Sequence, residues 1–265
     1  KMKIIIIIPT FNEEGSIGNL IDEVIKETSK ITNHKIELLI VDGKSKDNTV
    51  KIVNEKKNKY QNINFIIETE KKGLGGAYIE AMNHSLYVLN ADAIMEFDGD
   101  SQHDPKDIHK LVEKLDEGFE HIIGSRYIPG GTIPKTWKLW RKFLSFFGNK
   151  IAKVGLNKKK KDSTSGFKLT LMSKFKNDLP LSSEKILSLR HAYKIHLLHD
   201  LIALGAKTTE VPINFLDRNK GISKSTFEDI SESLKIIFIL RYRKIRNAFI
   251  VKNKLGVNKK TTDRN

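Results

Sequence analysis

The stretch AIMEFDGDSQHDP, residues 93–105, begins as an apolar strand and ends in three closely spaced carboxylates. Asp104 precedes Pro105 and the helical pattern PKDIHKLVEKL, which is the arrangement of an N-cap residue followed by proline at the first helical position. Asp98 and Asp100 have no such structural explanation. Because residues two apart on an extended chain project to the same side, both carboxylates would face one ligand.

Two carboxylates side by side in a cleft repel each other unless a cation lies between them. Hard oxygen ligands of this kind suit Mg²⁺ or Mn²⁺, held together with substrate phosphates and water. A D-x-D pair also occurs in ordinary acidic surface turns, so the pair at Asp98 and Asp100 needs support from the rest of the chain. We therefore regard it as a candidate metal site that the surrounding sequence has to justify.

Apolar runs alternate with segments of helical period through the first half of the chain. The runs are KIIIIIP (3–9), IELLIVD (36–42), INFIIE (63–68), AIMEFD (93–98) and HIIGS (121–125), and a further strand is expected within KTTEVPINF (207–215). Strands separated by single helices indicate crossover connections and a parallel sheet. Ligands of such sheets gather beyond the carboxyl ends of the strands, where PTFNEE, DGKSKDNT, DGDSQHD and GSRY follow.

Composition limits the classes of protein to consider. A chain of 265 residues with 39% hydrophobic content can bury the core of one large α/β domain, and the absence of cysteine excludes disulfide frameworks and thiolate chemistry. The N-terminal apolar run is too short for a signal peptide, and no stretch reaches the roughly 18 to 20 apolar residues of a membrane span. We expect a soluble or peripheral protein without a transmembrane span.

The formal net charge of +15 calls for an anionic partner, either nucleic acid, a phosphorylated small molecule or an acidic membrane face. Much of the excess lies in NKKKKD (157–162) and in the stretch from Lys235 to the end, where a solvated Lys-rich surface is the alternative. Few aromatic residues are interleaved with the basic ones outside residues 137–147. We therefore expect no nucleic-acid partner.

Two basic segments have amphipathic patterns. Residues 137–156, WKLWRKFLSFFGNKIAKVGL, carry apolar residues at helical spacing with Lys and Arg on other faces, which is typical of an interfacial helix, although a helix packed on the core fits the same pattern. The second segment, within 226–252, follows a capping box from Ser225 to Glu228. Residues 253–265 have the composition of a disordered tail.

The chain resembles a family-2 glycosyltransferase of the GT-A fold, in the dolichyl-phosphate (polyprenyl-phosphate) mannosyltransferase branch. The resemblance rests on IIIPTFNEEGSI (6–17), VDGKSKDNT (41–49), KGLGGAY (72–78), FDGDSQHDP (97–105), IGSRYIPGG (123–131), DSTSGFKL (162–169) and EVPINFLDRNKGISK (210–224). It implies an α/β, Rossmann-like, mostly parallel sheet flanked by helices, with C-terminal amphipathic basic helices. The catalytic domain would span 1–225, with a nucleotide-sugar half at about 1–130 and an acceptor half at about 131–225.

The resemblance also implies roles for individual residues. Asp98 and Asp100 would bind the metal and the sugar nucleotide, one directly and the other partly through water, with Gln102 close by and Arg126 near the phosphates. The nucleotide would be held by Pro9, Asn12, Glu13, Asp42, Gly73 and Gly75, although a simple turn with a capping side chain also explains Asn12 and Glu13. The phosphates of the donor and of the lipid acceptor would contact Arg141, Ser145, Arg218, Ser223 and Lys224.

Two departures from the family pattern concern specificity. Relatives often show DDGS where this chain has Asp42, Gly43, Lys44 and Ser45, so the nucleotide pocket is expected to differ. An acidic residue is expected near the position of His196, and its replacement bears on donor choice or activity. His191, His196 and His199 suggest a metal cluster by type, but histidine on an apolar helical stretch favours a hydrogen-bonded packing role.

The expected function is transfer of a hexose, mannose from GDP-mannose being favoured, onto a polyprenyl or dolichyl phosphate, with inversion and with Mg²⁺ or Mn²⁺. The protein would act peripherally at the cytoplasmic face of a membrane, with a small membrane anchor subunit as an additional partner. An acceptor phosphate is largely ionised at neutral pH, so no dedicated base is required. Two alternatives remain open: a GT-A enzyme with a glycan or polysaccharide acceptor or a donor such as UDP-glucose, and a non-enzymatic module that binds anionic membranes or nucleic acid.

Overall fold

The computed structural model describes residues 1–137, 139, 142, 149, 160–217 and 227–262. In this part of the chain, one seven-stranded sheet has the strand order β3-β2-β1-β4-β6-β5-β7. The strands are β1 (Lys3–Thr10), β2 (Lys35–Asp42), β3 (Ile63–Ile67), β4 (Ala93–Glu96), β5 (His121–Ser125), β6 (Lys168–Thr170) and β7 (Thr208–Pro212). Strand β6 runs antiparallel to β4 and β5, and the other neighbouring pairs are parallel. The predicted α/β class with a mostly parallel sheet is confirmed.

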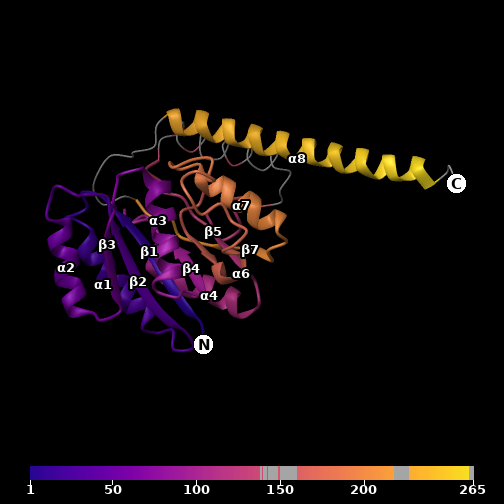
Figure 1. Ribbon diagram of the computed structural model, residues 1–265. Helices are drawn as coiled ribbons and strands as arrows, with labels where there is room; N and C mark the ends of the chain where they lie inside the picture. The colour runs from indigo at the N-terminus through magenta and orange to yellow at the C-terminus, as the bar shows by residue number, and fades with distance from the viewer. Residues whose placement is uncertain (138, 140–141, 143–148, 150–159, 218–226, 263–265) are drawn as a thin grey trace.

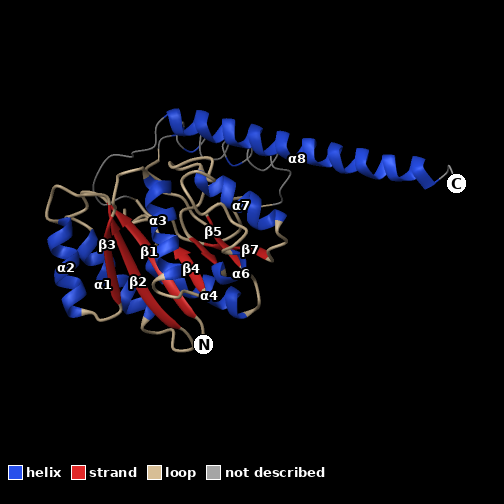
Figure 2. Cartoon of the chain, viewed as in Figure 1, coloured by secondary structure: helices blue, strands red, loops and turns tan. Residues whose placement is uncertain are grey.

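Helices lie around this sheet, as Figures 1 and 2 show. They are α1 (Ile17–Thr28), α2 (Thr49–Lys59), α3 (Leu74–Tyr87), the 3₁₀ turn η1 (Pro105–Asp107), α4 (Ile108–Asp116), α6 (Met172–Phe175), α7 (Tyr193–Ala203) and α8 (Phe227–Thr262). The backbone N–H of Lys106 donates to Asp104 Oδ1 over 3.0 Å, which confirms the predicted N-cap at Asp104 with Pro105 behind it. That proline-led turn carries the chain from the site loop into α4.

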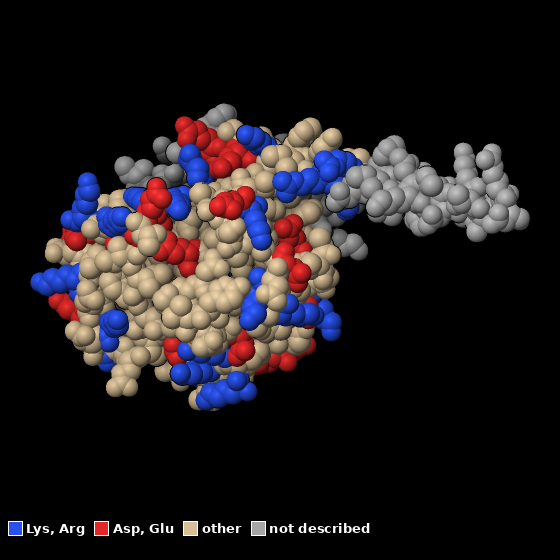
Figure 3. Space-filling view, viewed as in Figure 1, with Lys and Arg blue, Asp and Glu red and all other residues tan. Residues whose placement is uncertain are grey.

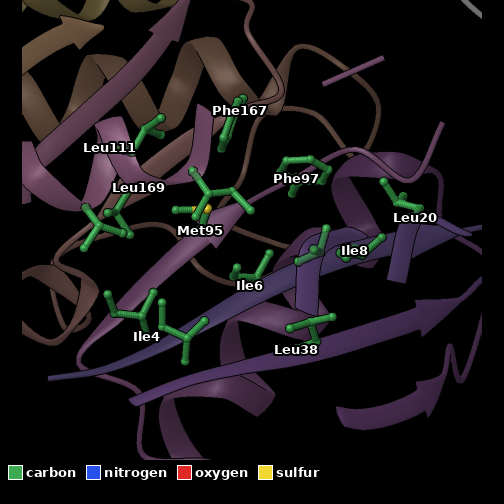
Figure 4. Packing of buried hydrophobic residues seen from close by; sticks show 14 of the residues in the cluster. Ile4, Ile6, Ile8, Leu20, Leu38, Met95, Phe97, Leu111, Phe167 and Leu169 are labelled. Carbon is green, nitrogen blue, oxygen red and sulfur yellow. The ribbon is translucent and has the colours of Figure 1, made fainter. Parts of the chain in front are cut away.

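Strand β1 lies at the centre of the hydrophobic core. Its residues Ile4 to Ile8 are fully buried, and successive side chains point to opposite faces of the sheet. Ile4, Ile6 and Ile8 pack with α1 and α4 on one face, while Ile5 and Ile7 pack with α3 and α7 on the other. Figure 4 shows the first of these clusters. Because helices cover both faces, the strand is continuously apolar instead of alternating.

Some features differ in extent from the sequence expectations. Strand β6, which begins within the quoted segment DSTSGFKL and ends at Thr170, was not predicted, because three residues are too short for a periodic signal. Helix α8 continues to Thr262, past the expected end of the amphipathic segment at 252. Most of the predicted helix at 137–156 lies outside the described residues, as does Ser225 of the predicted capping box.

Charge on the visible face is mixed. In Figure 3, Lys and Arg side chains are spread among Asp and Glu side chains and do not form a single basic patch. Among the described helices, none combines the length and the apolar character needed to cross a bilayer.

Candidate active site

The polar loops that follow β1, β2, β4 and β5 meet at one edge of the sheet. Thr10 at the end of β1 pairs with Asp42 at the end of β2, and Ile7 pairs with Glu96 at the end of β4. Asp98 follows two residues after β4. Parallel register therefore gathers the residues that the sequence predicted from separate motifs.

Asp98 lies against three side chains from other elements. Its Oδ1 accepts a hydrogen bond from the Tyr78 hydroxyl over 2.9 Å, and its Oδ2 lies 3.4 Å from Lys194 Nζ and 3.6 Å from His103 Nε2. Burial alone would raise the pKa of Asp98, but Lys194, His103 and Tyr78 outweigh burial and lower it. The carboxylate is thus ionised and internally neutralised before any ligand arrives.

A second layer of buried ionisable groups lies behind Asp98. The Tyr193 hydroxyl donates to Glu96 Oε2 over 2.5 Å, and burial raises the pKa of that hydroxyl. Lys168 is 2% exposed, and its pKa falls to about 8 because burial outweighs the attraction of Glu96. Sequence reasoning missed these residues and Lys194. The one available signal was the presence of Lys168 and Lys194 in otherwise apolar segments.

Asp100 and Gln102 form the turn that follows. The backbone N–H of Gln102 donates to Asp100 Oδ1 over 3.1 Å, and Ser101 between them has a φ of 59°. The Gln102 side-chain amide donates to the Leu216 carbonyl over 3.3 Å, and Leu216 N–H donates back to the Gln102 carbonyl over 2.7 Å. Gln102 therefore joins the carboxylate loop to the segment after β7.

Two glycines make room for the carboxylate loop. A Cβ atom on Gly99 would overlap the Pro9 carbonyl oxygen, and one on Gly166 would overlap Asp98 Oδ2. Only glycine lets the backbone approach so closely. The Pro9 carbonyl is in this way brought against the D-x-D loop, and a contact of Pro9 with the nucleotide stays a prediction.

Arg126 lies directly after β5 and is paired with a buried aspartate. Its Nε and Nη2 atoms donate to the two carboxylate oxygens of Asp162 over 2.7 and 2.8 Å, and Nη2 also donates to Thr164 Oγ1 over 3.0 Å. Burial would lower the pKa of Arg126, but Asp162, with Asp98 as a weaker contributor, raises it. Sequence reasoning quoted Asp162 without assigning it a role, and the phosphate contact of Arg126 stays a prediction.

The loops after β1 and β2 are tied together around Asp42, which is fully buried. The Ser45 backbone N–H and hydroxyl donate to Asp42 over 2.8 and 2.6 Å. The Asn12 N–H donates to the Ser45 hydroxyl over 2.8 Å, and the Glu13 N–H donates to Thr49 Oγ1 over 2.8 Å. The predicted nucleotide residues thus lie together, and their hydrogen bonds within the protein also give them a structural role.

The glycine segment has a packing partner. A Cβ on Gly75 would lie 2.7 Å from the Arg190 carbonyl oxygen, and Gly76 N–H donates to the Leu189 carbonyl over 3.1 Å. Gly73, with a φ of 89°, precedes α3 in a conformation that favours glycine. Close contact with residues 189–190 accounts for these glycines, and their contact with a nucleotide stays a prediction.

Of the other residues named from the sequence, five lie outside the described part of the chain, and His196 lies on α7. Arg141, Ser145, Arg218, Ser223 and Lys224 lie outside the described residues. His196 is 3% exposed, its Nδ1 accepts from the Leu187 N–H over 3.2 Å, and its Nε2 lies 3.3 Å from Asp200 Oδ2. Burial lowers the pKa of His196. These contacts are those of a packing residue on α7.

The sequence comparison assigns the family. The model of the family described as "Glycosyl transferase family 2" matches residues 5–179. The chain belongs to glycosyl transferase family 2. This family-2 transferase is 29% identical over 232 residues to polyprenol monophosphomannose synthase of Mycolicibacterium smegmatis, covering 87% of this chain and 83% of that one. It is 28% identical to undecaprenyl-phosphate mannosyltransferase of Micrococcus luteus, covering 88% and 91%.

A third relative is longer than this family-2 transferase. Dolichol-phosphate mannosyltransferase of Pyrococcus furiosus is 30% identical over 243 residues, which cover 90% of this chain and 64% of the relative. The chain therefore spans slightly less than two thirds of that enzyme.

Solved structures share the fold of the family-2 transferase. Glucosyl-3-phosphoglycerate synthase from Mycobacterium tuberculosis, solved with phosphoglyceric acid, gives a TM-score of 0.64 at 16% identity and covers 91% of this chain and 80% of that one. Mannosyl-3-phosphoglycerate synthase from Rubrobacter xylanophilus gives 0.64 at 15% identity, covering 93% and 75%. These likenesses confirm the predicted GT-A-type fold.

The donor atoms present suit a divalent cation. The Mycobacterium tuberculosis enzyme has also been solved with Mn²⁺ and uridine diphosphate. In this family-2 transferase, the described residues contain no group of three or more His, Cys, Asp or Glu side chains that could hold a metal alone. Asp98 and Asp100 offer hard oxygen atoms at a strand end, a donor set that Mg²⁺ or Mn²⁺ accepts when diphosphate and water complete the coordination.

Proposed function

We propose that this glycosyltransferase moves mannose from GDP-mannose onto a polyprenyl or dolichyl phosphate with inversion at the anomeric carbon. The observation that carries the proposal is the cluster of Asp98, Asp100 and Arg126 at the carboxyl edge of the sheet, where the charge of Arg126 interacts with that of Asp98. The names of the three relatives, all polyprenyl-type phosphate mannose enzymes, supply the donor sugar and acceptor class.

Asp98 and Asp100 would have different roles at the donor diphosphate. In this proposal Asp98, which Tyr78, Lys194 and His103 hold in place, orients the donor, and Asp100 is the direct metal ligand. When bound, Mg²⁺ or Mn²⁺ supplies Lewis-acid stabilisation of the departing nucleoside diphosphate.

Arg126 would hold the acceptor phosphate in line with the anomeric carbon. Asp162 fixes the plane of the guanidinium with two hydrogen bonds, which pre-organises Arg126 for a second oxygen ligand. The acceptor phosphate is ionised at neutral pH, so the chain needs to align it and to neutralise its charge, and no base has to remove a proton. Direct displacement converts an α-linked donor into a β-linked product.

We propose a membrane surface, at its cytoplasmic face, as a further partner, and the described side chains of helix α8 support a contact with lipid. Ile236, Ile237 and Leu240 are buried against Ala192 and Ile195. On another face of the helix, four apolar side chains form an exposed stripe. They are Leu234 (43% exposed), Phe238 (72%), Tyr242 (58%) and Ile245 (60%). Lys235, Arg241 and Arg246 lie at helical spacing beside the stripe. An exposed apolar stripe bordered by basic residues suits an anionic lipid surface.

The reaction is tested by transfer of radiolabelled sugar from a panel of nucleotide sugars to a short polyprenyl phosphate, with Mn²⁺ and then with EDTA. Metal-dependent lipid product from GDP-mannose supports the proposal. Product from UDP-glucose would show that the donor is UDP-glucose and not GDP-mannose. Product with a sugar alcohol but not with polyprenyl phosphate would show that the acceptor is a glycan. Absence of any product, despite nucleotide binding by calorimetry, would overturn the proposed reaction.

The membrane contact is tested by co-sedimentation with vesicles of anionic and of neutral phospholipid. The wild-type chain should bind the anionic vesicles, and Phe238→Ser with Tyr242→Ser should reduce binding by about tenfold or more, because each buried aromatic side chain contributes on the order of 1.5 to 3 kcal/mol. Tyr87→Ser, at a side chain of α3 that is 59% exposed, is the matched control. Equal binding by the double variant and the control would exclude α8 as the contact.

A further inference from the structure

Glu68 follows β3 directly and brings a buried carboxyl group next to Asp42. The residue is 4% exposed, and its backbone N–H donates to the Asp42 carbonyl over 2.9 Å. Its Oε1 atom is buried and accepts no hydrogen bond from the described residues. A buried carboxyl oxygen without a donor is costly, so an N–H donor supplied by a ligand would stabilise this atom.

Gly43, directly after Asp42, has no side chain and so leaves room for the Glu68 carboxyl group. A Cβ atom on Gly43 would lie 2.9 Å from Glu68 Oε2 and 3.6 Å from the ring of Phe11. A larger residue at position 43 would therefore displace the Glu68 side chain. Where relatives often have an aspartate, this chain has Gly43. The carboxyl group of Glu68, which follows β3, lies in that region instead.

The charges around Glu68 make its ionisation sensitive to a ligand. Its pKa is raised to about 7, first by burial and then by Glu80 of α3, with a smaller contribution from Asp42, while Lys71 and the backbone N–H of Lys72 act in the opposite direction. A ligand that presents N–H donors would stabilise the ionised form. The flat ring of Phe11 lies nearby, with Lys71 Nζ 2.9 Å from its centroid.

We infer that Glu68 is a specificity-determining residue that accepts hydrogen bonds from N1–H and the 2-amino group of a guanine base. Guanine offers two adjacent N–H donors on its pairing edge, and a carboxylate offers two acceptor oxygens with no donor. Uracil instead presents one N–H between two carbonyl oxygens, which a carboxylate repels. The inference rests on the proposed function and deepens it, because it names the contact that selects the donor nucleotide.

The test is calorimetric binding of GDP and UDP with Mn²⁺, at pH 8 and pH 6, to the wild-type chain, Glu68→Gln and the control Glu70→Gln. Glu70 is 75% exposed at its side chain, so its substitution leaves the buried site intact. Loss of hydrogen bonds to a charged group should weaken GDP binding by about ten- to hundredfold in Glu68→Gln, while UDP binding should not weaken, because the repulsion of the two uracil carbonyl oxygens is removed. Gly43→Ala, which pushes on the same carboxyl group, should weaken GDP in the same direction.

The ratio of GDP to UDP affinity separates this contact from effects on the phosphates, which the two nucleotides share. In the wild-type chain the ratio should fall from pH 8 to pH 6 as Glu68 takes up a proton, and in Glu68→Gln it should not change with pH. A GDP-to-UDP affinity ratio at pH 8 that is the same in Glu68→Gln as in the wild-type chain, or a wild-type preference for UDP, overturns the inference and leaves transfer to a polyprenyl phosphate standing. Failure of both nucleotides to bind overturns the proposed function together with the inference.

Discussion

Arg126 and Asp162 form a buried ion pair with two parallel hydrogen bonds, Nε to Oδ2 at 2.7 Å and Nη2 to Oδ1 at 2.8 Å. The side chain of Arg126 is 9% exposed and that of Asp162 is fully buried. The pair joins the end of β5 to the segment before β6, so the proposed phosphate ligand is held by a residue 36 positions away in the chain.

Asp162→Asn should destabilise the protein by about 3 to 5 kcal/mol, because it leaves a buried guanidinium without its carboxylate. Urea unfolding of the variant measures this loss. The double variant Arg126→Met with Asp162→Asn should be less destabilised than Asp162→Asn alone, since no unpaired charge remains. A loss below about 1 kcal/mol in the single variant would contradict the buried pair.

Asp100→Ala should reduce metal-dependent transfer by at least about a hundredfold, because the proposed direct ligand of the cation is lost. Initial rates with Mn²⁺ at saturating donor measure the effect. Asp104→Ala is the control from the same loop: it removes the N-cap of η1, should cost about 1 kcal/mol of stability and should keep transfer near the wild-type rate. Wild-type turnover in Asp100→Ala would refute its role.

Gly166→Ala should abolish transfer, because the added methyl group would occupy the position of Asp98 Oδ2 and force the carboxylate away from Lys194. Gly18→Ala on α1 is the control, since its Cβ would meet side-chain atoms alone, Ile52 Cγ2 at 3.2 Å and Lys56 Cε at 3.5 Å. Both variants are compared by transfer rate and by thermal unfolding. Full activity in Gly166→Ala would show that Asp98 has no fixed position in the reaction.

Lys168 should give the protein a pH-dependent stability between pH 8 and 10.5. Its pKa is about 8 in the folded chain against an ordinary value of 10.5, so within this window the unfolded chain holds a proton that the folded chain has released. Stability therefore rises with pH across the window, and below pH 8 the full cost of burying the charged lysine is present.

Lys168→Met removes that cost, so its stability advantage over the wild-type chain should be largest below pH 8 and should shrink as the pH approaches 10.5. Urea unfolding at pH 7, 8, 9 and 10 follows the difference, with the exposed Lys51→Met as a control. A difference that does not vary with pH would mean that Lys168 titrates normally in the folded chain.

The sequence predicted the strands that end at the site because each is a short apolar run followed at once by polar residues. Helix α4 with its Asp104 cap was equally readable, since a cap and a proline are local signals. Strand β6 and the buried Lys168 were not readable, because a three-residue strand has no period and its place between β4 and β5 depends on pairing with residues far away in the chain.

The candidate site divides in the same way. The sequence by itself determined the family and the parallel sheet and predicted Asp98 and Asp100 as site residues, because these depend on local pattern and on motifs with fixed spacing. Only the tertiary structure decided that Lys194 neutralises Asp98, that Asp162 holds Arg126 and that Glu68 is buried beside Asp42. The physical reason is that such pairs join residues from 26 to 96 positions apart, and a contact at that separation is set by packing and register, which no local pattern encodes.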